Sequence, residues 1–284
     1  MYLYQGQHYT SINEVPSDVL VAFIQQEVLS ETIAINQNKI LFWEEHYLRL
    51  MASMRILRMK IPLRFTLEYL SEKIIELTTS ISTQAFNGRV HLNVVKMAQP
   101  SLEHPIPETA FSITAAFAKE GQAAFVYKKT NQAIDLYKDH YLSMGLYNSL
   151  ESAAQQWRKM AWTYVYENDY CDGILLNTDK HLVETLQGAI FLIKGNEIST
   201  PSLDQGCRKT VYRKQLLTLL EKSSAYEIKE EAISPFSIQK AEELFVLSDA
   251  TGLYSIKQYR KKVFTTKQTE NIYSLFTAQM NSLA

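Results

Sequence analysis

The hydrophobic and polar positions of this chain alternate between helix-like and strand-like spacing from one end to the other. Apolar residues recur every three or four positions in five segments, and this spacing predicts helices at 44–59, 65–79, 147–165, about 208–222 and 265–282. Shorter runs rich in β-branched and aromatic residues predict strands at 89–97, 108–117, 173–177, 189–195, 225–229, 243–248 and 252–258. Near the N-terminus we expect an edge hairpin at 1–10, strands around a loop at 19–35, and a hairpin turn at NQNK, 36–39. The mixture predicts an α/β or α+β protein.

The order of these segments predicts two domains. AKEGQ at 118–122 is polar and has the composition of a linker. We therefore expect a smaller N-terminal α/β domain at 1–118 and a larger C-terminal domain at 119–284. Ligands commonly bind in clefts between such domains, so a small-molecule ligand is expected there.

Composition and charge narrow the possible partners. The net charge of −1 gives no electrostatic reason to expect nucleic acid or a membrane surface as a partner. Two cysteines, Cys171 and Cys207, are too few for a disulfide framework, and the histidines lack metal-ligand spacing, so no metal is expected. The N-terminus has no signal-peptide pattern, and no apolar run approaches the roughly 20 residues that span a bilayer. We expect a cytoplasmic protein.

Several segments together are similar to one enzyme family. The segment 30–57, SETIAI…KILFWEEHYLRLMASMRIL, resembles the family's FETI…EEHLxRL pattern. DGILLN at 172–177 and VETLQGAIF at 183–191 resemble its next two motifs. The chain is identified by these motifs as a member of the class IV aminotransferases, the fold type IV pyridoxal-phosphate (PLP) enzymes. That family includes branched-chain and D-amino-acid aminotransferases and aminodeoxychorismate lyase. The resemblance implies its two-domain fold, a homodimer and PLP as cofactor.

The resemblance also assigns roles to residues outside the reacting centre. Arg49 stands where the family's arginine grips the cofactor phosphate, and Glu184 stands where its glutamate bonds the pyridine nitrogen. Other phosphate contacts come from the start of a helix and from a turn, here Thr210, Val211, Ser248 and Asp249. Thr210 replaces a glycine of the family, and Asp249 puts an acid where the family has a hydroxyl. Both departures disfavour phosphate binding.

The most consequential departure lies at the Schiff-base lysine. Counting back from DGILLN, and forward through the similar lead-in at 134–152, this position is Glu151. A carboxylate cannot form an imine, so the sequence predicts a family member that has lost the family reaction and carries no covalently attached PLP. Two alternatives remain. The chain could be an active PLP enzyme whose lysine is Lys159 or Lys138, or an unrelated enzyme that uses Glu151 and Glu184 as an acid/base pair.

Overall fold

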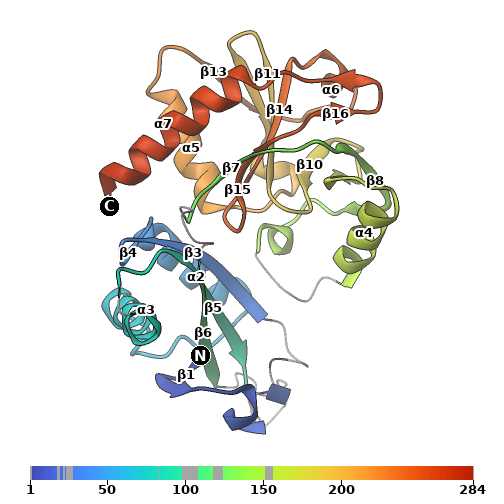
Figure 1. The fold of residues 1–284 in the computed structure, drawn as a ribbon. Helices are drawn as coiled ribbons and strands as arrows, with labels where there is room; N and C mark the ends of the chain where they lie inside the picture. Colours follow the sequence, from blue (N-terminus) through green and yellow to red (C-terminus); the bar gives the residue numbers. More distant parts are fainter. Residues whose placement is uncertain are drawn as a thin grey trace. The chain divides into compact units, whose positions relative to one another are not determined.

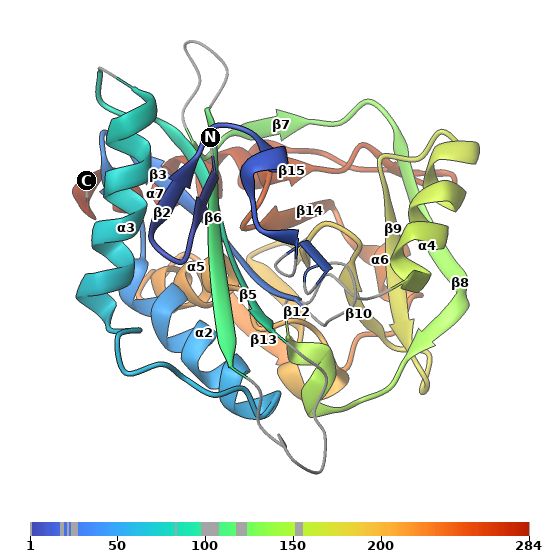
Figure 2. The same cartoon turned by 90° about the horizontal axis from the view of Figure 1, so that it is seen from below.

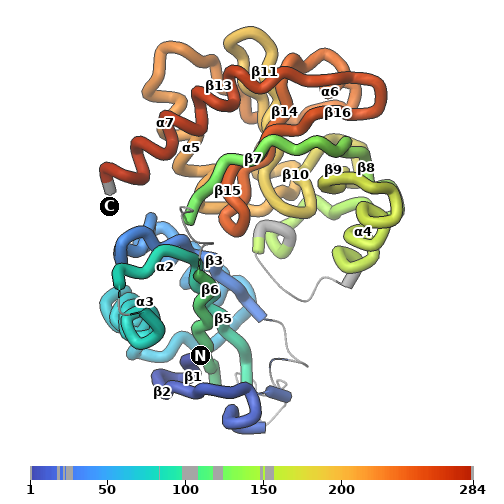
Figure 3. The backbone as a smooth tube through the Cα atoms, in the orientation of Figure 1, coloured from blue at the N-terminus to red at the C-terminus, as the bar shows by residue number. Residues whose placement is uncertain are grey.

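The computed structural model describes residues 2–17, 20–21, 23, 28–82, 84–97, 108–117, 124–150 and 156–283. These residues form two units, the first containing the described residues up to Ala124 and the second those from Phe125 onward. Figure 1 draws the elements of each unit, and Figure 3 traces the course of the chain through them. The expected linker at 118–122 lies outside the described residues.

The first unit is a six-stranded sheet covered by helices on one side. Its strand order is β2-β1-β6-β5-β3-β4, and all the pairings are antiparallel. From Gly88 to Val94 of β5, alternate residues are buried, because one face of the sheet packs on the core. Figure 2 shows α2 and α3 on one side of this sheet. The elements are β1 (Tyr2–Tyr4), β2 (Gln7–Tyr9), β3 (Val28–Asn36), β4 (Lys39–Ile40), α2 (Trp43–Ile56), α3 (Leu67–Ile81), β5 (Gly88–Lys96) and β6 (Thr109–Phe117).

The second unit contains two sheets whose apolar faces share one core. A five-stranded sheet has the order β10-β9-β8-β16-β17, and a six-stranded sheet has the order β13-β12-β11-β14-β15-β7. Ile174 of the first sheet and Ile190 and Leu244 of the second belong to one buried cluster. The strands are β7 (Tyr127–Lys129), β8 (Ala133–Leu142), β9 (Asp172–Asn177), β10 (Leu182–Thr185), β11 (Ala189–Lys194), β12 (Glu197–Pro201), β13 (Glu227–Glu231), β14 (Glu243–Ser248), β15 (Gly252–Ser255), β16 (Gln258–Tyr259) and β17 (Lys262–Val263).

Helices cover the sheets of the second unit. They are α4 (Gln156–Glu167), α5 (Val211–Glu221), the single turn α6 (Ser237–Lys240) and the C-terminal α7 (Lys267–Leu283). Ala161 and Val165 of α4 pack on Leu175 of β9 in a second buried cluster. None of the described helices combines the length and apolar character that a membrane crossing requires.

Three local predictions differ from the structure. The segment 19–35 was expected to be strands around a loop, but Leu20, Val21 and Phe23 are helical and β3 begins at Val28. Pro16 precedes this helical stretch, and proline is favoured at a helix start. The helix expected at 44–59 ends at Ile56, because Arg58 adopts the left-handed conformation that commonly terminates helices. Leu150 has extended backbone rather than helical, and α4 begins at Gln156.

Candidate functional site

Glu184 is the most completely bonded of the predicted site residues. It lies in β10 with 2% of its surface exposed. Arg208 donates from its side-chain Nε to both carboxylate oxygens, at 2.9 and 3.0 Å, and from its backbone amide to Oε2 at 2.9 Å. Arg158, on α4, donates from Nη2 to Oε1. Glu184 therefore accepts from three N–H groups, and the Nε–H of Arg208 is shared between its two oxygens.

The same contacts fix the charge of Glu184. Burial raises the pKa of its carboxyl, but the positive charges of Arg208 and Arg158 outweigh burial and hold the pKa below its usual value. Both arginines also donate to the carbonyl of Leu186, Arg158 at 3.2 Å and Arg208 at 3.4 Å. The two guanidinium groups are thus positioned by a carboxylate and by a carbonyl two residues further along the chain.

Asp172 holds that part of the backbone in place. It is fully buried, and its Oδ1 accepts from the amides of Gly173 at 2.7 Å and Leu186 at 3.1 Å. Its other oxygen accepts from the hydroxyl of Tyr254. Burial raises the pKa of Asp172 to about 6, although the hydrogen bonds from Tyr254 and Gly173 oppose the shift. Asp172 therefore positions Leu186, whose carbonyl receives the two arginines.

The raised pKa of Asp172 predicts a specific pH dependence of stability. A carboxyl whose pKa is higher in the folded state favours folding while it is protonated, and this contribution is lost as the pH rises through about 6. Asp172→Asn cannot ionise there, yet its amide oxygen can still accept from both backbone amides. We expect the unfolding free energy of the wild type, relative to Asp172→Asn, to fall by about 2 kcal/mol between about pH 4.5 and about pH 7. Urea unfolding of both proteins at several pH values measures this; a constant difference would contradict it.

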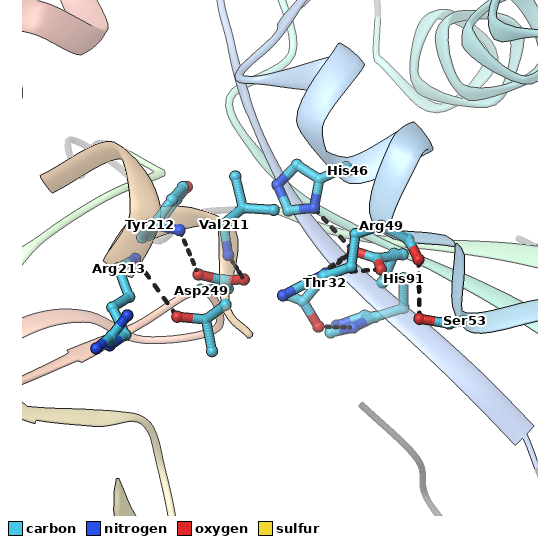
Figure 4. A network of polar contacts seen from close by, with 11 residues as sticks. Thr32, His46, Arg49, Ser53, His91, Val211, Tyr212, Arg213 and Asp249 are labelled. Carbon is cyan, nitrogen blue, oxygen red and sulfur yellow. Dashed lines mark hydrogen bonds and ion pairs between the residues drawn. The ribbon is translucent and has the colours of Figure 1, made fainter. Parts of the chain in front are cut away.

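The first backbone amides of α5 are hydrogen-bonded to other residues of the chain. Thr210 is the capping residue, and its hydroxyl oxygen accepts from the amide of Arg213 at 3.4 Å. The carboxylate of Asp249 accepts from the amide of Val211 at 3.1 Å and from that of Tyr212 at 3.0 Å (Figure 4). A helix start leaves its first amides without partners inside the helix. Here the first three have partners supplied by Thr210 and Asp249.

A tight turn brings Asp249 to the helix. Ser248 ends β14, and its hydroxyl oxygen accepts from the amides of Ala250 and Thr251, both at 3.2 Å. Gly252 then begins β15 with a φ of 91°, and a Cβ there would lie 2.3 Å from the carbonyl oxygen of Val126. Only glycine is accommodated at such a position. Ser248 therefore shapes the turn, while Asp249 contacts α5.

Arg49 has an acidic partner within the first unit. Its guanidinium donates to both oxygens of Glu31, with Nε at 2.9 and 3.1 Å and Nη2 at 2.5 Å. His46 lies 2.8 Å from the same carboxylate through Nδ1 (Figure 4). Burial raises the pKa of Glu31, but Arg49 and His46 outweigh it and keep the pKa below its usual value. The arginine expected to grip a phosphate thus holds a carboxylate on β3.

The structure gathers five of the predicted residues in its second unit, namely Glu184, Thr210, Val211, Ser248 and Asp249, and places Arg49 in the first. Glu151 lies outside the described residues. Sequence reasoning did not identify Glu31 as the partner of Arg49, or Arg158 and Arg208 as the partners of Glu184. The motifs imply that Glu184 and Arg49 are buried, and a buried charge requires an opposite charge beside it. This burial was the available signal that both residues have charged partners. Among the described residues, no group of three histidine, cysteine or acidic side chains could hold a metal ion.

Comparison with known proteins identifies the family. A family model described as amino-transferase class IV matches residues 29–259. A probable branched-chain-amino-acid aminotransferase of Aquifex aeolicus is 26% identical over 256 residues, which cover 82% of this chain and 76% of that protein.

Solved structures give the same answer for the fold. A branched-chain amino acid aminotransferase of Thermobaculum terrenum in PLP-form has a TM-score of 0.84 at 14% identity, covering 100% of this chain and 94% of that one. A putative 4-amino-4-deoxychorismate lyase of Legionella pneumophila has a TM-score of 0.78 at 17% identity, covering 96% of each chain. The fold is that of the fold type IV enzymes. With the family model matching most of its length, the chain belongs to the class IV aminotransferases.

Proposed function

We propose that this chain is a class IV aminotransferase relative that has lost lysine-dependent PLP chemistry. The proposal rests on Glu151, which stands at the lysine position when the chain is aligned with the family motifs. Its register is counted from matching segments on both sides, the lead-in at 134–152 and DGILLN at 172–177. The family reaction needs an amine at this position, both to attach the cofactor and to move the substrate proton. A glutamate supplies no such amine.

The described residues do not fit PLP in their present arrangement. A protonated pyridine nitrogen would have to compete for Glu184, whose oxygens already accept from Arg158 and Arg208. A cofactor phosphate would have to displace Asp249 from the first amides of α5. In the first unit, Arg49 is bonded to Glu31. Each group that the resemblance assigns to the cofactor is bonded to a residue of this chain, which supports the proposal.

A non-catalytic role as a binding protein follows from this proposal. The proposal also includes a small-molecule ligand other than PLP, a homodimer and a cytoplasmic location. These three properties are expected from the resemblance and the sequence. Because Glu184 and both arginines are ordered by mutual contacts, we expect them to maintain the fold rather than to perform acid/base chemistry.

Visible absorbance tests the proposal. Lysine-bound PLP absorbs visible light, whereas ordinary side chains do not, so the purified protein is expected to be colourless. Added PLP should give no new protein-bound absorption after the free cofactor is removed by gel filtration. Retained visible absorption, together with amino-acid-dependent spectral change, would overturn the proposal and favour the active enzyme with Lys159 or Lys138 as its lysine.

A further inference from the structure

We propose that the carboxylate of Asp249 takes the place of a phosphate group at the N-terminus of α5. Phosphorylated ligands are thereby prevented from binding there. Asp249 and the residues that it contacts all belong to the second unit, and these contacts do not depend on the identity of residue 151. The exclusion of phosphate therefore goes beyond the loss of lysine chemistry, since a protein can lack the lysine and still bind a phosphate.

The contacts of Asp249 are those that an anionic ligand makes at a helix start. Its two oxygens accept separately from two successive amides, Val211 at 3.1 Å and Tyr212 at 3.0 Å. Backbone amides at the first turn, together with the helix dipole, favour a negative charge at this point. Asp249 supplies that charge, and only 9% of its surface is exposed. The carboxylate is therefore an integral part of the unit rather than a mobile surface group.

The third backbone amide of the first turn, that of Arg213, also has a hydrogen-bond acceptor. Thr210 caps the amide of Arg213, and the Arg213 side chain is bonded to the carbonyl of Pro201 at 2.6 Å and to Glu230 at 2.7 Å. A phosphate arriving at α5 would meet the charge of Asp249 and would find the first-turn amides already bonded. Like charges at contact distance repel by several kcal/mol at an intermediate dielectric, on the order of 4 kcal/mol. Both effects exclude phosphate in the wild type.

Removing the carboxylate should convert the helix start into a phosphate site. Asp249→Ala frees the amides of Val211 and Tyr212 and removes the repelling charge, and Asp249→Asn removes the charge with little change of shape. Glu221→Ala is the matched control, because Glu221 is exposed at the opposite end of α5 and its removal changes the net charge equally.

Titration with inorganic phosphate, followed by amide chemical shifts in NMR and by calorimetry, tests the proposal. We expect Asp249→Ala to bind phosphate at least tenfold more tightly than the wild type and Glu221→Ala, with the largest shifts at the amides of Val211 and Tyr212. Pyridoxal phosphate should show the same gain, and pyridoxal, which lacks the phosphate, should show none. If Asp249→Ala does not fold, Asp249→Asn is measured, with a smaller gain at the same amides.

Two outcomes would overturn the inference. One is equal phosphate affinity in the wild type and both Asp249 variants. The other is a gain that appears equally in Glu221→Ala, since that would reflect net charge alone. The phosphate titration varies residue 249 and leaves residue 151 unchanged, whereas the proposed function is tested by lysine-bound PLP in the wild type. Failure of this inference and failure of the proposed function are therefore distinguishable.

Discussion

Arg208→Met is expected to lower the free energy of unfolding by about 3 kcal/mol, because it leaves the buried carboxylate of Glu184 with one cation instead of two. Arg208 is 8% exposed, and its side-chain Nε–H is shared between the two oxygens of Glu184. Arg158 remains as a partner, which keeps the loss at the lower end of the range for a broken buried ion pair. Urea unfolding followed by circular dichroism measures the change.

Two further variants separate the ion pair from general damage. Arg55→Met removes an exposed arginine from α2 and should change stability by less than about 0.5 kcal/mol. Adding Glu184→Gln to Arg208→Met removes the buried carboxylate charge that has lost the guanidinium of Arg208. The double variant should therefore be more stable than the sum of the two single losses predicts. A loss below about 1 kcal/mol for Arg208→Met, or strict additivity, would show that Glu184 does not depend on Arg208.

Gly188→Ala is expected to destabilise the protein by about 3 kcal/mol through overpacking between β11 and β14. A Cβ at Gly188 would lie 2.2 Å from the carbonyl oxygen of Leu247 and 3.0 Å from the Cα of Ser248. Backbone atoms cannot rotate away from such a contact, so the end of β14 must shift. Since Asp249 follows Ser248, we expect the amide signals of Val211 and Tyr212 to move as well.

Gly145→Ala is the control for this prediction. Its Cβ would meet nothing within 4 Å, and its φ of −172° is open to any residue. We expect a change of less than about 0.5 kcal/mol in urea unfolding, whereas Gly188→Ala should be much less stable. Equal stability of the two variants would mean that the β11–β14 pair accommodates a methyl group without strain.

The strands and helices that surround the candidate site were predictable where the local signal was strong. DGILLN and ELFVLS each contain a short continuous apolar run and form the buried strands β9 and β14. The periodic segments near 208–222 and 265–282 form α5 and α7. The strand β10 was not predicted, because four residues are too few to show an alternation. The helical residues before β3 were misread for a related reason, since a short apolar run is compatible with either structure.

The sequence predicts which residues belong to the candidate site better than it predicts which residues they contact. Arg158 and Glu184 are 26 residues apart, and Arg49 and Glu31 are 18 apart, so their pairing depends on how helices pack on strands. Sequence patterns identify such residues as candidates but do not choose their partners. Asp249 illustrates the difference. The sequence predicts a negative charge beside a phosphate position, and the structure adds that this charge is bonded to the amides of α5.

Borohydride reduction followed by peptide mass mapping tests the central claim most directly, because it asks whether any lysine of this chain carries PLP. The wild-type protein, purified and also incubated with PLP, is reduced and digested beside Glu151→Lys, which places an amine at the position that we propose for the lost lysine. We predict no pyridoxyl-lysine peptide above the level of surface lysines in the wild type, and at most partial labelling of residue 151 in the variant. A stoichiometric pyridoxyl-lysine peptide from the wild type, at Lys159, Lys138 or elsewhere, would contradict the account and identify the chain as a PLP enzyme.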